Sequence, residues 1–119
     1  MNFSDYFDPI NINEGDLHFD YHDNQFINTI DFYKDQETSE YNIAIIGVGE
    51  ERNSSNMGCS AAPNNIRKYL YRLTGFKNTT KIIDLGNLRI GATSEDTYFA
   101  LSSILEYLIK NNVLPIIIG

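Results

Sequence analysis

Three apolar runs rich in β-branched residues alternate with two stretches of helical periodicity between residues 41 and 119. The apolar runs cover Ile43–Val48, Lys81–Gly86 and Val113–Ile118. Continuous runs of this kind are typical of strands buried on both faces, which belong to parallel sheets covered by helices. The pattern therefore predicts an α/β protein with a parallel three-stranded βαβαβ core and right-handed crossovers.

The first helical stretch opens at Ala61–Pro63 and is expected to end before Gly75. Proline suits the first turn of a helix, and glycine suits the position after the last turn. Apolar residues recur at helical spacing on one side, which we expect to be buried. The expected buried side holds Ile66, Tyr69, Leu70 and Leu73, and the expected solvent side holds Arg67, Lys68 and Arg72.

The second helical stretch follows a start signal, in which the hydroxyl of Thr93 precedes the carboxylates of Glu95 and Asp96. A hydroxyl cap followed by acidic residues suits the positive end of the helix dipole. The helix is expected to end at Asn111-Asn112. Its expected buried stripe is Leu101, Ile104, Leu105 and Leu108.

Residues 1–40 differ in composition and form an acidic, aromatic N-terminal extension. They hold ten of the sixteen acidic residues against one cation, Lys34, together with eight of the fifteen Phe and Tyr residues. Such an aromatic content is not typical of disorder, so we expect the extension to pack against the rest of the protein. Residues 41–119 are expected to form the α/β domain.

Within the extension, the stretch Asp16–His22 alternates strictly between polar and apolar positions, which predicts a half-buried strand. A short element is expected over Phe26–Tyr33, followed by a linker at 34–40. The polar face of the predicted strand carries residue types that ligate borderline metals, although a solvated face is the commoner outcome. That face consists of Asp16, His18, Asp20 and His22.

The cysteine content, the lengths of the apolar runs and the distribution of basic residues exclude several classes of protein. A single cysteine, Cys59, excludes an internal disulfide, and we expect it to be a small buried residue rather than a reactive thiol. No apolar run approaches the roughly 20 residues of a membrane span, and the N-terminus lacks the basic start of a signal peptide. No basic stripe with interleaved aromatic residues occurs, so nucleic acid is not an expected partner. These features predict a soluble cytoplasmic protein.

The loop Gly49–Ser60 is long for a strand-to-helix connection, and long ordered loops are often functional. The glycines at its start do not make a dinucleotide fingerprint, because Arg52 stands where the third glycine belongs. Asp84 stands near a strand end, where its carboxylate suits ligand contact and turn formation equally. No nucleophile, base and acid set can be assembled, since both histidines lie in the acidic extension.

Four segments, taken in order, resemble the ureohydrolase family, which comprises arginase, agmatinase and formimidoylglutamase. The resemblance extends from about Asn42 to Gly119 and rests on the order and spacing of the segments. The segments are Ile45–Val48, Gly58–Pro63 leading into Ile66-Arg67, Asp84–Asn87 and Leu114–Gly119.

The resemblance implies a three-layer α/β/α sandwich, in which the first strand lies between the second and third and the two helices cover opposite faces. It also implies hydrolysis of a guanidino or amidino group by a hydroxide that bridges two manganese ions. The family's first metal ligand is a histidine after a Gly-Gly pair, of which Gly119 matches the first glycine. None of the ligands falls within residues 1–119, so we expect an N-terminal portion of a longer enzyme that is inert alone.

By the same resemblance, the loop Gly49–Ser60 corresponds to one near the mouth of the family's active site. Glu50, Arg52 and Asn56 are therefore candidates for contacting the substrate or a neighbouring subunit, with a loop-fixing role as the alternative. Arg67 is expected to be structural and to bond to a nearby loop or carboxylate. The alternative function is a non-catalytic α/β interaction or assembly module. A homo-oligomer is expected. Self-association or strand swapping is expected through Val113–Ile118, because the outer side of this strand would normally be paired by strands that residues 1–119 do not contain.

Overall fold

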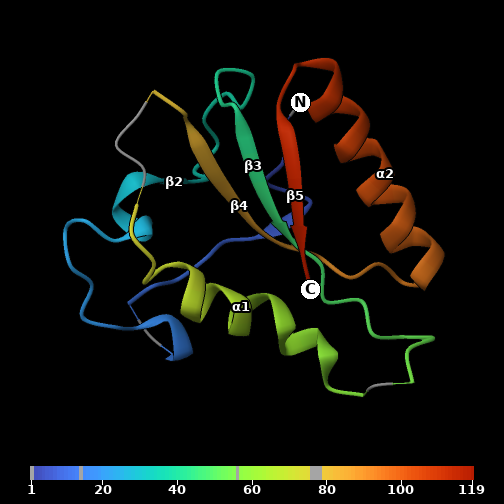
Figure 1. Cartoon of the computed structure of the whole chain (residues 1–119). Helices are drawn as coiled ribbons and strands as arrows, with labels where there is room; N and C mark the ends of the chain where they lie inside the picture. The colour runs from blue at the N-terminus through green and yellow to red at the C-terminus, as the bar shows by residue number, and fades with distance from the viewer. Residues whose placement is uncertain (1, 14, 56, 76–78) are drawn as a thin grey trace.

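The computed structural model of the chain describes residues 2–13, 15–55, 57–75 and 79–119 (Figure 1). Its centre is a mixed five-stranded sheet, in which β3 (Ile43–Gly47) lies between β4 (Ile82–Leu88) and β5 (Leu114–Ile118). These three strands are parallel to one another. The predicted parallel core, with its first strand in the middle, is therefore confirmed.

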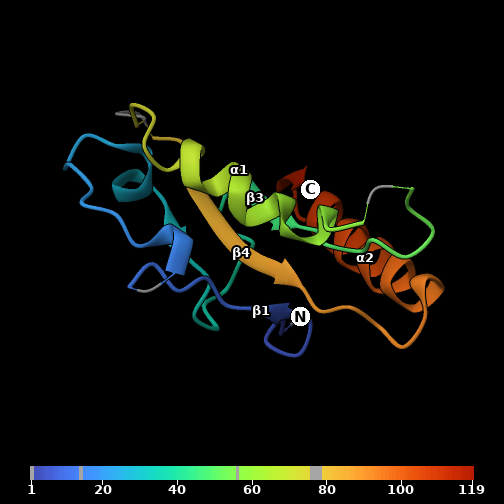
Figure 2. The same ribbon diagram turned by 90° about the horizontal axis from the view of Figure 1, so that it is seen from below.

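Two helices cover the opposite faces of the sheet. The connection from β3 to β4 contains α1 (Ala62–Leu70), and the connection from β4 to β5 contains α2 (Ser94–Lys110) (Figures 1 and 2). Side chains alternate between the two faces of a strand, so neighbouring β3 residues enter different cores. Ala44 and Ile46 pack in the core that contains Ile104 and Leu108 of α2, whereas Ile45 packs in the other core, beside α1.

The N-terminal extension adds two short strands to the outer edge of β4. Strand β1 (Phe7–Asp8) runs antiparallel to the end of β4, and β2 (Asp31–Phe32) runs parallel to its beginning. The expectation of a three-stranded parallel sheet was too narrow, because two-residue strands leave no periodic signal in a sequence. The expected packing of the extension is confirmed by the buried rings of Phe3, Phe7 and Phe26.

The predicted strand over Asp16–His22 is wrong. The 3-10 turn η1 (Gly15–Leu17) occupies its start, and residues 18–22 form no regular element. The Tyr21 hydroxyl donates a hydrogen bond of 2.7 Å to the carbonyl of Leu17, which fixes a local loop instead of a strand pair. The alternation of polar and apolar residues over 16–22 therefore does not correspond to a strand. The short element expected next is found as the 3-10 helix η2 (Phe26–Thr29) followed by β2.

Helix α1 begins as predicted, with Pro63 in its first turn, but its buried and exposed sides differ from the expectation. Arg67 is completely buried, whereas Ile66, Tyr69 and Leu73 are exposed. The periodicity was misleading because Arg67 finds acidic and amide partners inside the protein. The regular helix also ends at Leu70, earlier than predicted.

Helix α2 confirms the predicted start and the predicted stripe. Thr93 and Asp96 form a reciprocal capping box, in which each side chain accepts a hydrogen bond from the backbone N–H of the other. Ile104 and Leu108 are fully buried against the sheet. Asn112, just after the helix, adopts a left-handed conformation with φ of 59°, which suits asparagine at a helix end.

The sequence predicts a strand that ends at Gly86. Strand β4 instead continues through Gly86 to Leu88. Its pairing with β3 shifts register between Ile45 and Ile46, so Leu85 is an extra residue in β4 and forms a bulge. Gly86 has φ of +99°, and a β-carbon there would lie 2.3 Å from the carbonyl oxygen of Asp8. Glycine at this position therefore allows β1 to approach β4.

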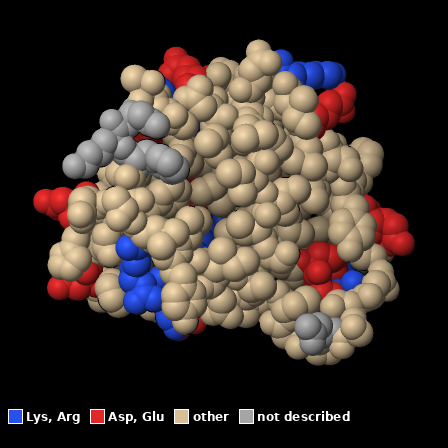
Figure 3. Space-filling model, viewed as in Figure 1, with Lys and Arg blue, Asp and Glu red and all other residues tan. Residues whose placement is uncertain are grey.

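Strand β5 is the opposite edge of the sheet, and among the described residues no strand pairs with its outer side. Its side chains Leu114, Ile116 and Ile117 are 60%, 42% and 47% exposed. Figure 3 shows the face of the molecule that is turned to the viewer in Figure 1. The middle of this face is largely uncharged, and most charged side chains lie toward its rim. No helix among the described residues is long and apolar enough to cross a membrane.

Candidate functional site

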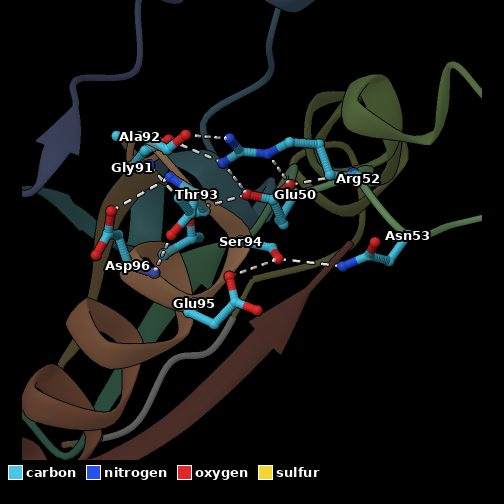
Figure 4. Close-up of polar contacts among 10 residues, drawn as sticks. Glu50, Arg52, Asn53, Gly91, Ala92, Thr93, Ser94, Glu95 and Asp96 are labelled. Carbon is cyan, nitrogen blue, oxygen red and sulfur yellow. Dashed lines mark hydrogen bonds and ion pairs between the residues drawn. The ribbon is translucent and has the colours of Figure 1, made fainter.

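The candidate site is the loop that leaves the carboxyl end of β3 and leads to α1. It is held against the segment that precedes and starts α2, and Figure 4 shows the polar contacts between them. The carboxyl ends of parallel strands are the usual place for ligand sites in open α/β sheets. The sequence-predicted residues Glu50 and Arg52 both lie in this loop, whereas Asn56 lies outside the described residues.

Glu50 is the centre of these contacts, and its side chain is only 1% exposed. One carboxylate oxygen accepts hydrogen bonds from the Arg52 backbone N–H at 3.0 Å and from Arg52 Nε at 2.7 Å. The other oxygen accepts from Arg52 Nη2 at 2.7 Å and from the Thr97 hydroxyl at 2.8 Å. These donors hold the pKa of Glu50 at about 2, with the Arg52 hydrogen bonds as the largest cause.

Arg52 connects the carboxylate of Glu50 to the backbone before α2. Its Nη1 donates to the carbonyl of Ala92 and its Nη2 to the carbonyl of Gly91, each at 2.8 Å. Its side chain is 41% exposed, so the guanidinium has one side toward solvent. Asn53 adds a further link, since its amide donates to the Ser94 hydroxyl at 3.1 Å.

The second acidic residue of the loop, Glu51, fixes the loop internally. One of its oxygens accepts backbone hydrogen bonds from Gly58 at 2.9 Å and from Ser60 at 3.1 Å. The same N–H groups lower the pKa of Glu51. Glu50 and Glu51 are therefore both ionised at neutral pH and both engaged by donors of the protein itself.

These contacts define what the loop can do chemically. A carboxylate that already accepts four hydrogen bonds and has a pKa near 2 is a weak base. The geometry therefore favours a positioning role for Glu50 and for the Arg52 groups that bind it. Sequence analysis named Glu50 and Arg52 as separate candidates and predicted neither their pairing nor their anchor, Thr97, which lies far away in the sequence and carries no local signal.

A second polar cluster lies beneath α1 and was only partly expected. Arg67 and Asp84 form a two-point ion pair, with Nε to one carboxylate oxygen at 2.9 Å and Nη2 to the other at 2.8 Å. Both side chains are completely buried. The Tyr71 hydroxyl donates to Asp84 at 2.8 Å, and Arg67 also donates to the side chains of Asn64 and Asn87.

The sequence left two roles open, ligand contact and turn formation, and the contacts of this cluster support a structural role for Asp84. Its carboxylate accepts from Arg67, from Tyr71 and from the backbone N–H of Gly86 at 3.0 Å, so it is a structural group that joins α1 to β4. The expected structural role of Arg67 is confirmed by the same bonds. Burial raises the pKa of the Tyr71 hydroxyl, and the charge of Asp84 raises it further.

Cys59 is partly exposed, contrary to the expectation of a buried residue. It begins the 3-10 turn η3 (Cys59–Ala61) at the end of the loop, and its Sγ lies 3.7 Å from the Ser54 hydroxyl. The loop exposes this residue because residues 51–55 and 57–60 lie on the surface and are held mainly by polar contacts.

The residues that the structure describes do not fit a dinuclear manganese centre. No group of three or more His, Cys, Asp or Glu side chains among them is placed to hold a metal ion. The nearby carboxylates of Glu50, Glu51 and Asp84 accept hydrogen bonds from protein donors, and those donors would have to be displaced before these oxygens could serve as ligands. Residues 16–22 do not form the predicted strand, and their Asp and His side chains are not gathered into a group that could hold a metal ion.

The arrangement defines a protein of the α/β class, with a sheet covered by a helix on each face and a long loop at the carboxyl end of its central strand. A family model for the arginase family matches residues 41–119, and the chain belongs to that family. The comparisons with curated proteins and with solved structures gave no match.

Proposed function

We propose that this chain is the N-terminal scaffold portion of a ureohydrolase-type enzyme that hydrolyses a guanidino or amidino carbon–nitrogen bond. The observation that carries the proposal is the family match over 41–119, which coincides with the parallel core and its two covering helices. In a complete family member two manganese ions would supply the nucleophile by lowering the pKa of bound water. The residues described here do not provide the ligands for those ions.

In this proposal the loop after β3 shapes one side of the substrate entrance. Glu50 and Arg52 hold the loop against the start of α2, and the solvent side of the Arg52 guanidinium is the group best placed to contact a substrate or a neighbouring subunit. Asn56 remains a candidate by resemblance alone. The buried Arg67–Asp84 pair sets the position of α1, which follows the loop.

A manganese-dependent assay tests this proposal. The chain should bind no stoichiometric pair of manganese ions in calorimetry and should release neither urea nor formamide from guanidino or amidino substrates. The product of the complete reading frame should do both, and its sequence after Gly119 should supply a second glycine followed by the ligand histidine. Binding of two ions by the chain alone would contradict our assignment, and a complete product without ligands or activity would contradict the hydrolase proposal.

A non-catalytic assembly module is the second candidate, and the exposed apolar side chains of α2, among them Phe99 at 76% and Ile109 at 62%, favour it. The aromatic residues of the extension do not favour a free binding arm, because Phe3, Phe7 and Phe26 are buried in the core. Homo-oligomer formation, which the sequence predicts, is compatible with either candidate.

A further inference from the structure

We propose that a cavity between the N-terminal extension and β4 binds a small organic carboxylate with an aromatic or aliphatic body. The proposal goes beyond the hydrolase function and does not depend on it, since no described residue of the loop after β3 lines this cavity. The lining comes from three separate segments, residues 4–9, 33–35 and 85–89. The cavity therefore exists because the extension packs on the outer edge of β4.

The cavity combines the size of a small-molecule site with an apolar floor. Its volume is about 360 Å³, which lies in the range of sites for single small molecules. Phe7 and Leu85 line it and are 3% and 1% exposed, as members of the core that α2 covers. The rings of Tyr33 and Pro9 complete the apolar part of the lining. The ring or hydrocarbon body of a ligand can therefore lie against nonpolar surface.

Backbone hydrogen bonds fix the walls of the cavity. The Arg89 N–H donates to the Tyr6 carbonyl at 2.8 Å, and the Tyr33 N–H donates to the Asp84 carbonyl at 3.0 Å. Strand β1 also pairs with the end of β4, which ties the first wall to the sheet. A ligand that enters walls already in place loses less free energy to the ordering of the protein.

Two cations, Lys34 and Arg89, line the cavity from different segments. Lys34 is the only Lys or Arg of residues 1–40, which contain ten acidic residues. Among the described residues no carboxylate forms an ion pair with it. Asp35 is the one acidic residue of the lining, so the lining has a net charge of +1 in a chain of net charge -7. This local excess of positive charge favours an anion over a cation.

The Arg89 guanidinium has the geometry that a carboxylate requires. Its Nε donates to Asp8 Oδ1 at 3.1 Å, which orients the group. Its Nη1 and Nη2 make no hydrogen bond with the described residues, and together they form a planar edge that matches the two oxygens of a carboxylate. The Asp8 side chain is 66% exposed, so solvent screens much of its charge. Asp8 thus holds the guanidinium and leaves one edge of it available.

These features assign a place to each part of the ligand. Its carboxylate accepts hydrogen bonds from Nη1 and Nη2 of Arg89 and lies near the Lys34 ammonium, and its apolar body covers Phe7 and Leu85. Neither part suffices alone, because an exposed ion pair contributes little and an apolar floor does not distinguish an anion from a neutral molecule. Benzoate, which has both parts, is therefore a suitable probe.

Titration with benzoate, followed in ¹H–¹⁵N NMR spectra of the chain, tests the site. The amide signals of residues 33–35 and 85–89 should shift and saturate. Benzamide has the same ring without the charge, and acetate has the same charge without the ring. Each should bind at least about tenfold more weakly than benzoate. No shift at these residues up to the solubility limit of benzoate overturns the site, and benzamide binding equal to that of benzoate overturns its preference for anions.

Substitutions test the two cations. Arg89→Gln should raise the Kd of benzoate at least about tenfold, and Lys34→Gln should raise it by a smaller factor. Arg89→Lys keeps the charge without the two-point edge and should fall between Arg89→Gln and the wild type. Lys110→Gln is the matched control, since it removes the same charge at the end of α2, where Lys110 pairs with Glu106, and should leave the Kd unchanged.

Asp8→Asn separates ligand contact from a structural role of Arg89. This variant removes the ion pair between Asp8 and Arg89 but keeps the guanidinium, so the Kd of benzoate should stay equal or fall. A rise in Kd as large as that of Arg89→Gln would mean that Arg89 acts only by holding β1, and it would overturn the direct contact. Equal effects of Lys110→Gln and Arg89→Gln would overturn it as well, because net charge alone would then explain the loss.

Discussion

The protein contains two arginine–carboxylate pairs with similar geometry and very different surroundings. Arg67 and Asp84 are joined at two points and are fully buried between α1 and β4. Arg52 and Glu50 are also joined at two points, but the arginine is 41% exposed on the surface loop. The comparison shows that the surroundings decide how much such a pair contributes to stability. A buried charge depends on its partner to offset the loss of hydration, whereas an exposed charge remains hydrated by solvent.

Breaking the buried pair should have the largest effect. Arg67→Met leaves the Asp84 carboxylate buried without its cation, which should lower the free energy of unfolding by about 3–5 kcal/mol. Urea denaturation followed by circular dichroism measures this loss. The double variant Arg67→Met with Asp84→Leu should recover much of the stability, because it leaves no unpaired charge. A single variant as stable as the wild type would show that the pair is not buried in solution.

Removing the hydroxyl that supports the pair should have an intermediate effect. Tyr71→Phe keeps the buried ring but deletes the hydrogen bond of 2.8 Å to Asp84. A bond to a charged group is worth about 1.5–3 kcal/mol, and the urea midpoint should shift accordingly. Tyr69→Phe is the control, because Tyr69 is 65% exposed and its hydroxyl should contribute little. Equal effects of the two substitutions would contradict the buried network.

The loop pair of Glu50 and the partly exposed Arg52 should have the smallest effect on stability at neutral pH, and this effect should depend clearly on pH. The pKa of Glu50 falls from 4.5 to about 2 in the folded chain. The contribution of Glu50 is therefore complete above about pH 4.5 and is lost as the pH falls toward 2, because the unfolded chain binds the proton first.

Melting temperatures of the wild type and Glu50→Gln, measured across this range, test the assignment. The two values should differ most at neutral pH and converge in acid. Glu106→Gln is the matched control, since Glu106 belongs to an exposed pair with Lys110 on α2 and makes no contact with the loop. A constant difference between the wild type and Glu50→Gln at every pH would show that the Glu50 charge is not responsible.

The fold was largely predictable because its signals are local. Buried strands give continuous apolar runs, and the capping box at Thr93 gives a hydroxyl followed by an acid. The short strands of the extension were not predictable, since two residues carry no period. The strand predicted over Asp16–His22 was wrong for a different reason. An alternating sequence forms a strand only where a neighbouring strand pairs with it, and this segment has no such partner among the described residues.

The candidate site was less predictable than the fold. Glu50 and Arg52 were candidates because the family resemblance places their loop near the mouth of the active site. The binding of Glu50 to Thr97, and of Arg52 to the carbonyls before α2, depends on tertiary structure and could not be predicted. Arg67 was assigned to the solvent side because a cation on a helix is usually exposed. Its burial depends on Asp84, which lies in another element, and helical periodicity contains no information about such a partner.

The position of the acidic extension on the outer edge of β4 has a consequence for the aggregation of the protein. An unpaired strand edge presents backbone N–H and C=O groups that can pair with another chain and promote aggregation. Residues 7–8 and 31–32 occupy one of the two edges. The extension therefore protects the outer edge of β4, and a chain without it would expose that edge to pairing with other chains and to aggregation.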